Sequence, residues 1–144
     1  MKVLQKTLTL ANIEQVGGEI IAALSNQEFC LWLIGDLGAG KTTLTKTMLK
    51  KLGLDPSVAV TSPTYTIMNE YQIGEQWYAH LDLYRASAGF NLEELGLSGW
   101  RSYRGVFVEW PEKSGDSSLI KPTHRLEIIA GPSDSEREIT LLRT

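Results

Sequence analysis

The stretch that decides the fold is Gly35-Asp36-Leu37-Gly38-Ala39-Gly40-Lys41-Thr42. It fits the pattern G-x-x-x-x-G-K-[ST] at every fixed position. Glycines let the backbone turn with its N–H groups pointing inward, so that the loop wraps around an anion. In such a loop Lys41 can reach the β- and γ-phosphates of a nucleotide, and the hydroxyl of Thr42 can bind Mg²⁺. The sequence therefore predicts a phosphate-binding loop over residues 35–42, with Thr43 as a further nucleotide contact.

The residues on both sides of this loop support the same prediction. Residues 29–34 form an unbroken apolar run, FCLWLI, which is typical of a strand buried on both faces. Residues 43–52 carry Leu44, Met48 and Leu52 on one stripe, which is the pattern of a helix. The N-terminus of that helix would add its partial positive charge to the loop. A chance Gly-rich turn is the alternative, and it requires the pattern and both flanking elements to coincide.

The composition is that of a globular protein and limits the kinds of partner. A length of 144 residues suits one domain, 1–144, with one core. The formal net charge of −3 argues against a free-standing nucleic-acid binder, which would usually carry a basic face. No apolar stretch approaches the roughly 20 residues that a membrane span needs, so we expect no membrane association.

Cysteine usage and the first residues of the chain bear on its compartment. The single cysteine, Cys30, cannot form an internal disulfide and lies in the apolar run, so we expect a small buried hydrophobic side chain there. A reactive thiol is the alternative. The first residues lack the apolar core of a signal peptide. Together these features favour a reducing cytoplasm.

The remaining elements are predicted from hydrophobic periodicity and turn residues. A helix is expected from Ile13, with Asn12 as its N-cap and Gln15 at the capping-box position, although Gly17 and Gly18 weaken it. Other expected elements are strands at 2–10, 58–60, 66–71, 76–84, 105–109, 123–130 and 137–142 and a short helix at 91–97. Helices between strands indicate parallel pairing, whereas hairpins indicate antiparallel additions. The predicted fold is α/β, a P-loop NTPase-like three-layer α/β/α sandwich with a mixed, mainly parallel sheet and antiparallel hairpin additions.

Two acidic residues on predicted strands are candidates for holding a metal and for orienting an attacking water. Glu109 ends the apolar strand 105–109, at the edge where parallel strands deliver functional residues. Asp82 lies in His80-Leu81-Asp82-Leu83-Tyr84-Arg85, and nucleotide hydrolysis needs both functions. The alternatives are a solvated acid at Glu109 and a surface salt bridge between Asp82 and Arg85. His80 could shuttle protons, but we favour a polar-face histidine on a strand.

One loop and the tryptophans leave alternatives open. The hydroxyl-bearing stretch Thr61-Ser62-Pro63-Thr64-Tyr65 suits either a nucleotide-sensing switch or an ordinary loop with Ser and Thr turn chemistry. Trp32 is expected in the core, and Trp77 and Trp100 are expected to pack against other residues. Trp110 either walls the nucleotide site or belongs to the core.

Four motifs occur in order along the chain. They are Gly35-Asp36-Leu37-Gly38-Ala39-Gly40-Lys41-Thr42-Thr43, Ser62-Pro63-Thr64-Tyr65, His80-Leu81-Asp82-Leu83-Tyr84-Arg85 and Val108-Glu109-Trp110-Pro111-Glu112. Their order and spacing resemble the TsaE-type ATPases of bacterial threonylcarbamoyladenosine synthesis over nearly the whole chain. One such motif is weak, whereas four in order are specific. The least similar part is the loop at 131–136.

The resemblance implies an ATPase that uses Mg²⁺, converts ATP to ADP and helps to modify tRNA. The modification is a threonylcarbamoyl group on the adenosine beside the anticodon, at tRNA position 37. As catalytic residues the resemblance implies Lys41 on the phosphates, Glu109 with the metal, and Asp82 in hydrolysis or in sensing the γ-phosphate. Thr42 and Glu109 are the implied magnesium-binding residues.

The resemblance also implies partners and further nucleotide contacts. A separate pair of proteins, TsaB and TsaD, would carry out the transfer, so that tRNA is reached indirectly through the complex. Residues 61–65 would act as a switch segment, with Thr64 as a nucleotide contact. The adenine would bind near Leu10 and Ala11, together with a residue of the C-terminal hairpin.

Two other classes of function stay open from the sequence. A small-molecule kinase on a P-loop scaffold would need a second substrate pocket and usually a mobile Arg-rich lid. Arg101 and Arg104 are the candidates for such a lid, but the sequence has no insertion of that length. A GTPase is disfavoured because the sequence has no Asn-Lys-x-Asp segment. A non-catalytic, nucleotide-gated binding module would use ATP only to control docking. Turnover that requires a small phosphoryl acceptor would identify a kinase.

Overall fold

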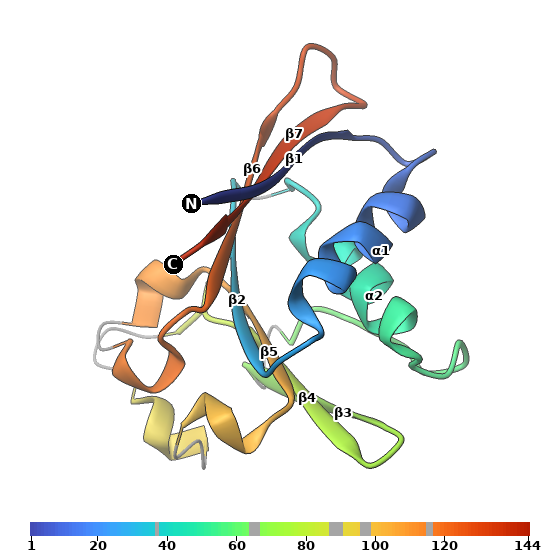
Figure 1. Cartoon of the computed structure of the whole chain (residues 1–144). Coiled ribbons are helices and arrows are strands. Elements are labelled where there is room, and N and C mark those ends of the chain that lie inside the picture. Colours follow the sequence, from blue (N-terminus) through green and yellow to red (C-terminus); the bar gives the residue numbers. More distant parts are fainter. Residues whose placement is uncertain (37, 64–66, 87–90, 96–98, 115–116) are drawn as a thin grey trace.

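The computed structural model describes residues 1–36, 38–63, 67–86, 91–95, 99–114 and 117–144, which form a seven-stranded sheet and two α-helices (Figure 1). The strands are β1 (Lys2–Leu8), β2 (Phe29–Ile34), β3 (Met68–Ile73), β4 (Gln76–Asp82), β5 (Gly105–Glu109), β6 (His124–Ala130) and β7 (Arg137–Arg143). The helices are α1 (Ile13–Leu24) and α2 (Lys41–Leu52).

The strand order across the sheet is β1-β7-β6-β2-β5-β4-β3. The pairs β2–β5, β2–β6 and β4–β5 are parallel, and the pairs β1–β7, β6–β7 and β3–β4 are antiparallel. The predicted α/β fold with a mixed sheet is confirmed, with three parallel and three antiparallel pairs. The parallel register sets Leu33 beside Glu109 and Glu109 beside Asp82. The two candidate acids therefore lie side by side at the carboxyl ends of the parallel strands β4 and β5.

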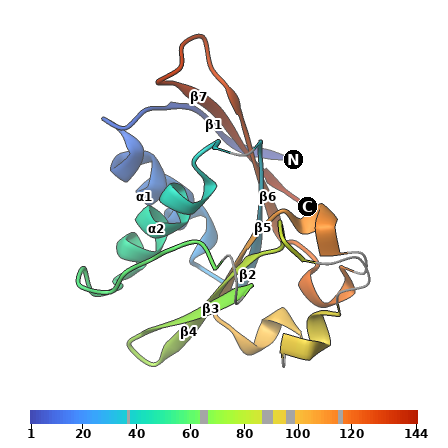
Figure 2. The same ribbon diagram turned by 180° about the vertical axis from the view of Figure 1, so that it is seen from behind.

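The two faces of the sheet are covered differently. Both α-helices lie on one face, as the opposite views in Figures 1 and 2 show. The other face is covered by short 3₁₀-helices, whose buried side chains pack on the strands. These 3₁₀-helices are Leu92–Leu95, Trp100–Ser102, Pro111–Ser114 and Ser118–Ile120. The layer opposite the α-helices thus contains 3₁₀-helices of only three or four residues each.

The central strand β2 is buried on both faces, as its apolar run predicts. Its odd-numbered residues Phe29, Leu31 and Leu33 pack with the two helices, and Cys30 packs on the opposite face. Cys30 is fully buried, and this burial raises the pKa of its thiol. The prediction of a small buried hydrophobic side chain is confirmed, because a thiol with a raised pKa is a poor nucleophile.

Three local predictions are wrong in whole or in part for identifiable physical reasons. Asn12 is the N-cap residue of α1, as predicted, but its side chain makes no capping hydrogen bond, because its Oδ1 accepts a hydrogen bond from the backbone N–H of Thr9 (2.7 Å). Residues 58–60 do not form a strand, because they pair with none of the seven strands of the sheet, and only Val60 of the three is buried. Trp77 is 45% exposed on β4, so it is not a packing residue.

The short helix predicted at 91–97 appears as the 3₁₀-helix Leu92–Leu95, with residues 96–98 outside the described ranges. Asn91 does act at its start, where its Oδ1 accepts the Glu93 N–H (2.9 Å). Trp100 is buried in the core on the sheet face opposite the α-helices, and the half-buried Trp32 packs against that part of the core, as predicted.

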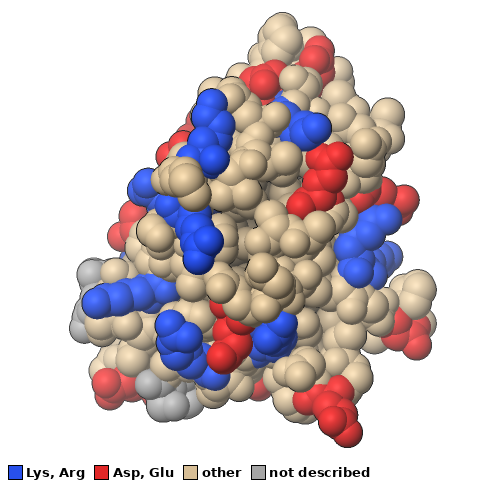
Figure 3. All heavy atoms as spheres, in the orientation of Figure 1, with Lys and Arg blue, Asp and Glu red and all other residues tan. Residues whose placement is uncertain are grey.

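The surface carries charges of both signs. Lys and Arg side chains and Asp and Glu side chains occur together over the face shown in Figure 3. Within the described ranges, no helix combines the length and apolar character needed to cross a membrane.

Candidate functional site

The phosphate-binding loop lies between the end of β2 at Ile34 and the start of α2 at Lys41. Gly38 and Gly40 have φ angles of 80° and 98°, a left-handed conformation that favours glycine. A strand that leads into a glycine-rich loop and then a helix N-terminus is the arrangement that binds phosphate with backbone N–H groups. Leu37, a predicted contact in this loop, lies outside the described residues.

Lys41 is held inside the site. Its side chain is buried, its Nζ donates to the Gly35 carbonyl (2.5 Å), and the same Nζ lies 3.6 Å from the centre of the Trp110 ring. Burial lowers the pKa of Lys41, and nearby carboxylates oppose this effect. Those carboxylates belong to Glu109, Glu112, Asp82 and Asp36. A bound anion would give this ammonium group a stronger partner than a backbone carbonyl.

Glu109 and Thr42 meet in the structure. The Thr42 hydroxyl donates to Glu109 Oε2 (2.9 Å), and Glu109 is only 3% exposed, so it is not a solvated strand-end acid. Hydroxyl and carboxylate oxygens are ligands that Mg²⁺ accepts, usually together with substrate phosphates and water. Among the described residues, no cluster of three or more His, Cys, Asp and Glu side chains could hold a metal by itself. The donor set therefore fits a magnesium ion shared between Thr42, Glu109 and a bound phosphate group.

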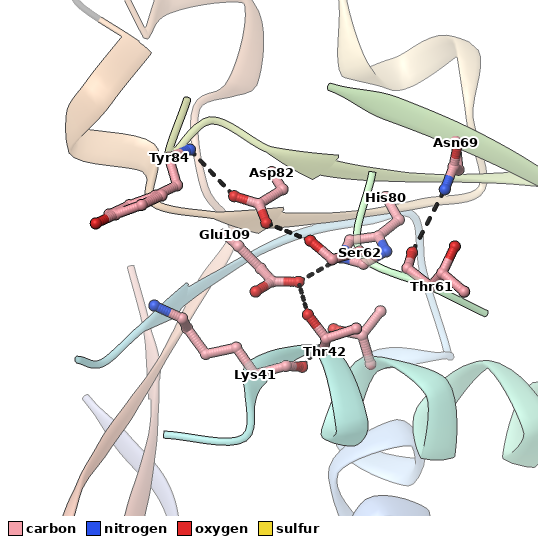
Figure 4. Close-up of polar contacts among 10 residues, drawn as sticks. Lys41, Thr42, Thr61, Ser62, Asn69, His80, Asp82, Tyr84 and Glu109 are labelled. Atoms are coloured by element: carbon pink, nitrogen blue, oxygen red, sulfur yellow. Dashed lines mark hydrogen bonds and ion pairs between the residues drawn. The ribbon is translucent and has the colours of Figure 1, made fainter. Parts of the chain in front are cut away.

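His80 is not the polar-face histidine that we favoured from the sequence. It is fully buried, and its Nε2 lies 2.5 Å from Glu109 Oε2 (Figure 4). Residues alternate between faces along a strand, so His80 and Asp82 share the β4 face on which Glu109 lies in β5. The sequence did carry one signal for this contact. His80 and Asp82 are two residues apart on a predicted strand, so they share a face, and Asp82 was already a candidate partner of Glu109.

Asp82 connects the site to the loop after α2. Its Oδ2 accepts from the Ser62 hydroxyl (2.6 Å), and its Oδ1 accepts from the Tyr84 N–H (3.0 Å) (Figure 4). In the part of the chain that the structure describes, Asp82 forms no ion pair with Arg85. The predicted switch segment therefore contacts the second acid through Ser62. Its residues 64 and 65, including the predicted nucleotide contact Thr64, lie outside the described residues.

These side chains line one pocket of about 450 Å³. Trp110 forms part of its wall and has a φ angle of 58°, which is uncommon for a bulky residue and is found most often at functional sites. Its ring lies 4.8 Å from that of Tyr84, measured between centres. Trp110 therefore combines the two interpretations left open from the sequence, because it lines this pocket and also packs, half-buried, against the core cluster on the sheet face opposite the α-helices. The pocket is lined by Gly38, Ala39, Gly40, Lys41, Thr42, Thr43, Ser62, Asp82, Tyr84, Arg85, Glu109 and Trp110.

A second pocket of about 450 Å³ lies on the other side of the loop. It shares the loop residues 38–40 and Thr43 with the first pocket. Leu10 and Ala11, the predicted adenine neighbours, line it. The β6–β7 hairpin contributes Asp134, Ser135 and Arg137, which the sequence indicated only as an unspecified hairpin residue. A nucleotide on the loop would therefore have one pocket on each side.

Comparisons with known proteins agree with this geometry. The family described as "Threonylcarbamoyl adenosine biosynthesis protein TsaE" matches residues 7–139. A Bacillus subtilis protein named "tRNA threonylcarbamoyladenosine biosynthesis protein TsaE" is 41% identical over 127 residues, which cover 85% of this chain and 74% of that protein. The protein of the same name from Aquifex aeolicus is 33% identical over 87% of this chain and 85% of its own length.

Two further comparisons extend this result. The Haemophilus influenzae protein of the same name is 40% identical over 97 residues, and the match covers 66% of this chain but only 60% of that protein. The crystal structure of Bacillus subtilis YdiB superimposes with a TM-score of 0.69 and 32% identity, covering 99% of this chain and 87% of that one. Because the family match spans most of the chain and the fold agrees, this chain belongs to the TsaE family.

Proposed function

We propose that this chain binds Mg-ATP at the phosphate-binding loop and hydrolyses it in support of tRNA threonylcarbamoylation. Membership of the TsaE family supports the pathway. The observation that carries the ATPase proposal is the contact between Thr42 and Glu109. It joins the last residue of the loop to a buried acid at a strand end. That combination serves magnesium and phosphate together in P-loop enzymes.

Each residue of the first pocket has a part in this proposal. The loop N–H groups and Lys41 hold the phosphates, because a charge-assisted hydrogen bond to an anion is stronger than a neutral one. Thr42 and Glu109 hold magnesium, which neutralises charge on the phosphates when it is bound. Asp82 orients the attacking water or senses the γ-phosphate. Its hydrogen bond from Ser62 would pass that state to the loop after α2.

The second pocket is proposed to receive the base of the nucleotide. Leu10 and Ala11 offer apolar surface on one side, and polar residues of the β6–β7 hairpin line the other. A largely apolar cleft with few polar groups is the usual surrounding of a bound ligand. The phosphates and the base would then occupy the two pockets on either side of Gly38.

The proposed setting is a cytoplasmic complex with TsaB- and TsaD-type proteins. The transfer of the threonylcarbamoyl group belongs to those partners, since the pockets of this chain are assigned to ATP and magnesium. The formal net charge of −3 supports contact with tRNA through the partners rather than by this chain alone.

Phosphate release from ATP tests the proposed function. The unchanged protein should release phosphate only with Mg²⁺ present. Lys41→Ala should abolish nucleotide binding, measured by calorimetry, because the site loses the cation that faces the phosphates. Lys50→Ala is the matched control, since Lys50 is exposed on the same helix. Near-normal ATP affinity in Lys41→Ala, or turnover that requires a small phosphoryl acceptor, would refute the proposal.

A further inference from the structure

The imidazole of His80 contacts Glu109, a residue that lines the first pocket, and has no role in the proposed function. It is fully buried within β4, and its Nε2 lies 2.5 Å from Glu109 Oε2. Its other nitrogen, Nδ1, is buried without a hydrogen-bond partner among the described residues. Burying a half-satisfied polar ring costs stability that an apolar side chain would not cost. Among the described residues, the contact with Glu109 is the side-chain hydrogen bond of His80 that offsets this cost.

The chemistry of the pair fixes the direction of the hydrogen bond. The proposed metal-binding role needs Glu109 as a carboxylate, which can only accept, so that role puts the hydrogen of the contact on His80 Nε2. The neutral imidazole with its hydrogen on Nε2 leaves Nδ1 as a bare acceptor. A buried acceptor without a partner is better tolerated than a buried N–H without one. The geometry therefore assigns the Nε2–H tautomer to His80.

The two donors to Glu109 come from different elements and meet the same oxygen. Thr42 Oγ1 from α2 and His80 Nε2 from β4 both contact Oε2 (Figure 4). The other oxygen, Oε1, makes no hydrogen bond to the described part of the chain. Thr42 is itself assigned to magnesium. His80 has no assigned role other than its contact with the Glu109 carboxylate.

We propose that His80 is a positioning residue that holds Glu109 Oε2 and so orients the carboxylate for magnesium. This inference rests on the proposed function, because it supposes that Glu109 binds the metal. Residues that hydrogen-bond a metal-binding side chain typically contribute about 10- to 100-fold in metal affinity. The contribution of His80 is therefore expected in metal affinity rather than in nucleotide affinity.

Manganese binding to the ADP-saturated protein tests this role, with Mn²⁺ as a paramagnetic substitute for Mg²⁺. His80→Leu removes the donor and should weaken Mn²⁺ binding about 10- to 100-fold. His80→Gln keeps an N–H donor on the side chain and should restore most of the loss. Both variants should bind ADP without metal as the unchanged protein does. His124→Gln is the matched control, because His124 is the other of the two histidines, is buried, and lines neither nucleotide pocket.

The outcomes separate this inference from the proposed function. His80→Leu with unchanged Mn²⁺ affinity would overturn the inference, and so would equal losses of Mn²⁺ affinity and metal-free ADP affinity, which indicate a merely structural role. Absence of Mn²⁺ binding in the unchanged protein would instead refute the proposed function, and the inference would fall with it.

A measurement on the unchanged protein makes the test independent of whether His80→Leu folds. Nitrogen-15 NMR of the imidazole rings reports which ring nitrogen carries the hydrogen. The two histidine signals can be assigned with His124→Gln. We expect His80 to carry its hydrogen on Nε2, and a bare Nε2 would overturn the inference.

Discussion

Glu109 and Asp82 are neighbouring acids with different surroundings, and these surroundings separate their chemistry. Glu109 is buried and contacts the hydroxyl that ends the phosphate-binding loop. Asp82 is half-buried and contacts Ser62 and a backbone N–H. The first set of contacts suits a metal-binding carboxylate, whereas the second suits a group that couples the nucleotide to a loop.

This difference predicts two distinct mutant phenotypes. Glu109→Gln should weaken Mn²⁺ binding and lower Mg-dependent turnover by about 100-fold or more, because several kcal/mol of charge stabilisation are lost. Asp82→Asn should lower turnover while leaving Mn²⁺ affinity near that of the unchanged protein. Manganese titration and phosphate release measure both quantities.

The exposed acid Glu112 supplies the control for this pair. Glu112→Gln should change neither quantity appreciably, since Glu112 acts on the site only through long-range charge. Loss of Mn²⁺ affinity in Asp82→Asn but not in Glu109→Gln would mean that the two roles are reversed.

Between the helices, two adjacent glycines of α1 have different surroundings. A methyl group at Gly17 would lie 2.8 Å from Thr47 Cγ2 on α2, whereas one at Gly18 would approach only Lys51 Cδ, at 3.8 Å. The first distance is a clash with a stiff β-branched side chain, and the second is ordinary contact. Gly17 therefore allows α1 and α2 to approach closely, while Gly18 costs helix stability without such a reason.

The matched pair Gly17→Ala and Gly18→Ala tests this interpretation. Gly18→Ala should raise the free energy of unfolding by about 0.5–1 kcal/mol, the gain in helix propensity. Gly17→Ala should lose that gain to a clash that costs about 1–3 kcal/mol. Urea unfolding measures both. Equal stabilisation by the two substitutions would show that the helices do not need the glycine.

Among the helices and strands, the sequence-based predictions were most accurate where a local motif and the residues on both sides of it indicate the same structure. The strand β2, the loop and α2 could be predicted because an apolar run, glycines and a helical stripe follow one another without interruption. The prediction of a strand at 58–60 was wrong because a strand forms only where it finds a pairing partner, and these residues pair with none of the seven strands. Hydrophobic pattern alone does not reveal whether a partner is present.

The two acids of the candidate site could be predicted from the sequence, but the hydrogen bonds that connect them to neighbouring residues could not. Glu109 and Asp82 end apolar strands, so parallel pairing brings them to one edge. The contact of His80 with Glu109 depends on the register of β4 against β5, and a single sequence does not give that register. The role of Trp110 likewise depends on a backbone conformation, with positive φ, that its sequence does not signal.

In the whole molecule, the sheet brings the candidate site residues together at the carboxyl ends of its parallel strands. The parallel strands β2, β4 and β5 end at the loop, at Asp82 and at Glu109. The antiparallel hairpin β6–β7 adds polar residues to the second pocket. The two pockets beside the loop therefore draw on both halves of the chain.

Phosphate release from Mg-ATP, with and without the TsaB and TsaD proteins of the same organism, tests this account most directly. We predict slow release by the chain alone, faster release with the pair, and none with Lys41→Ala under either condition. No small phosphoryl acceptor should be required. A rate that ignores the pair, together with transfer of phosphate to a small acceptor, would contradict the account and identify a kinase.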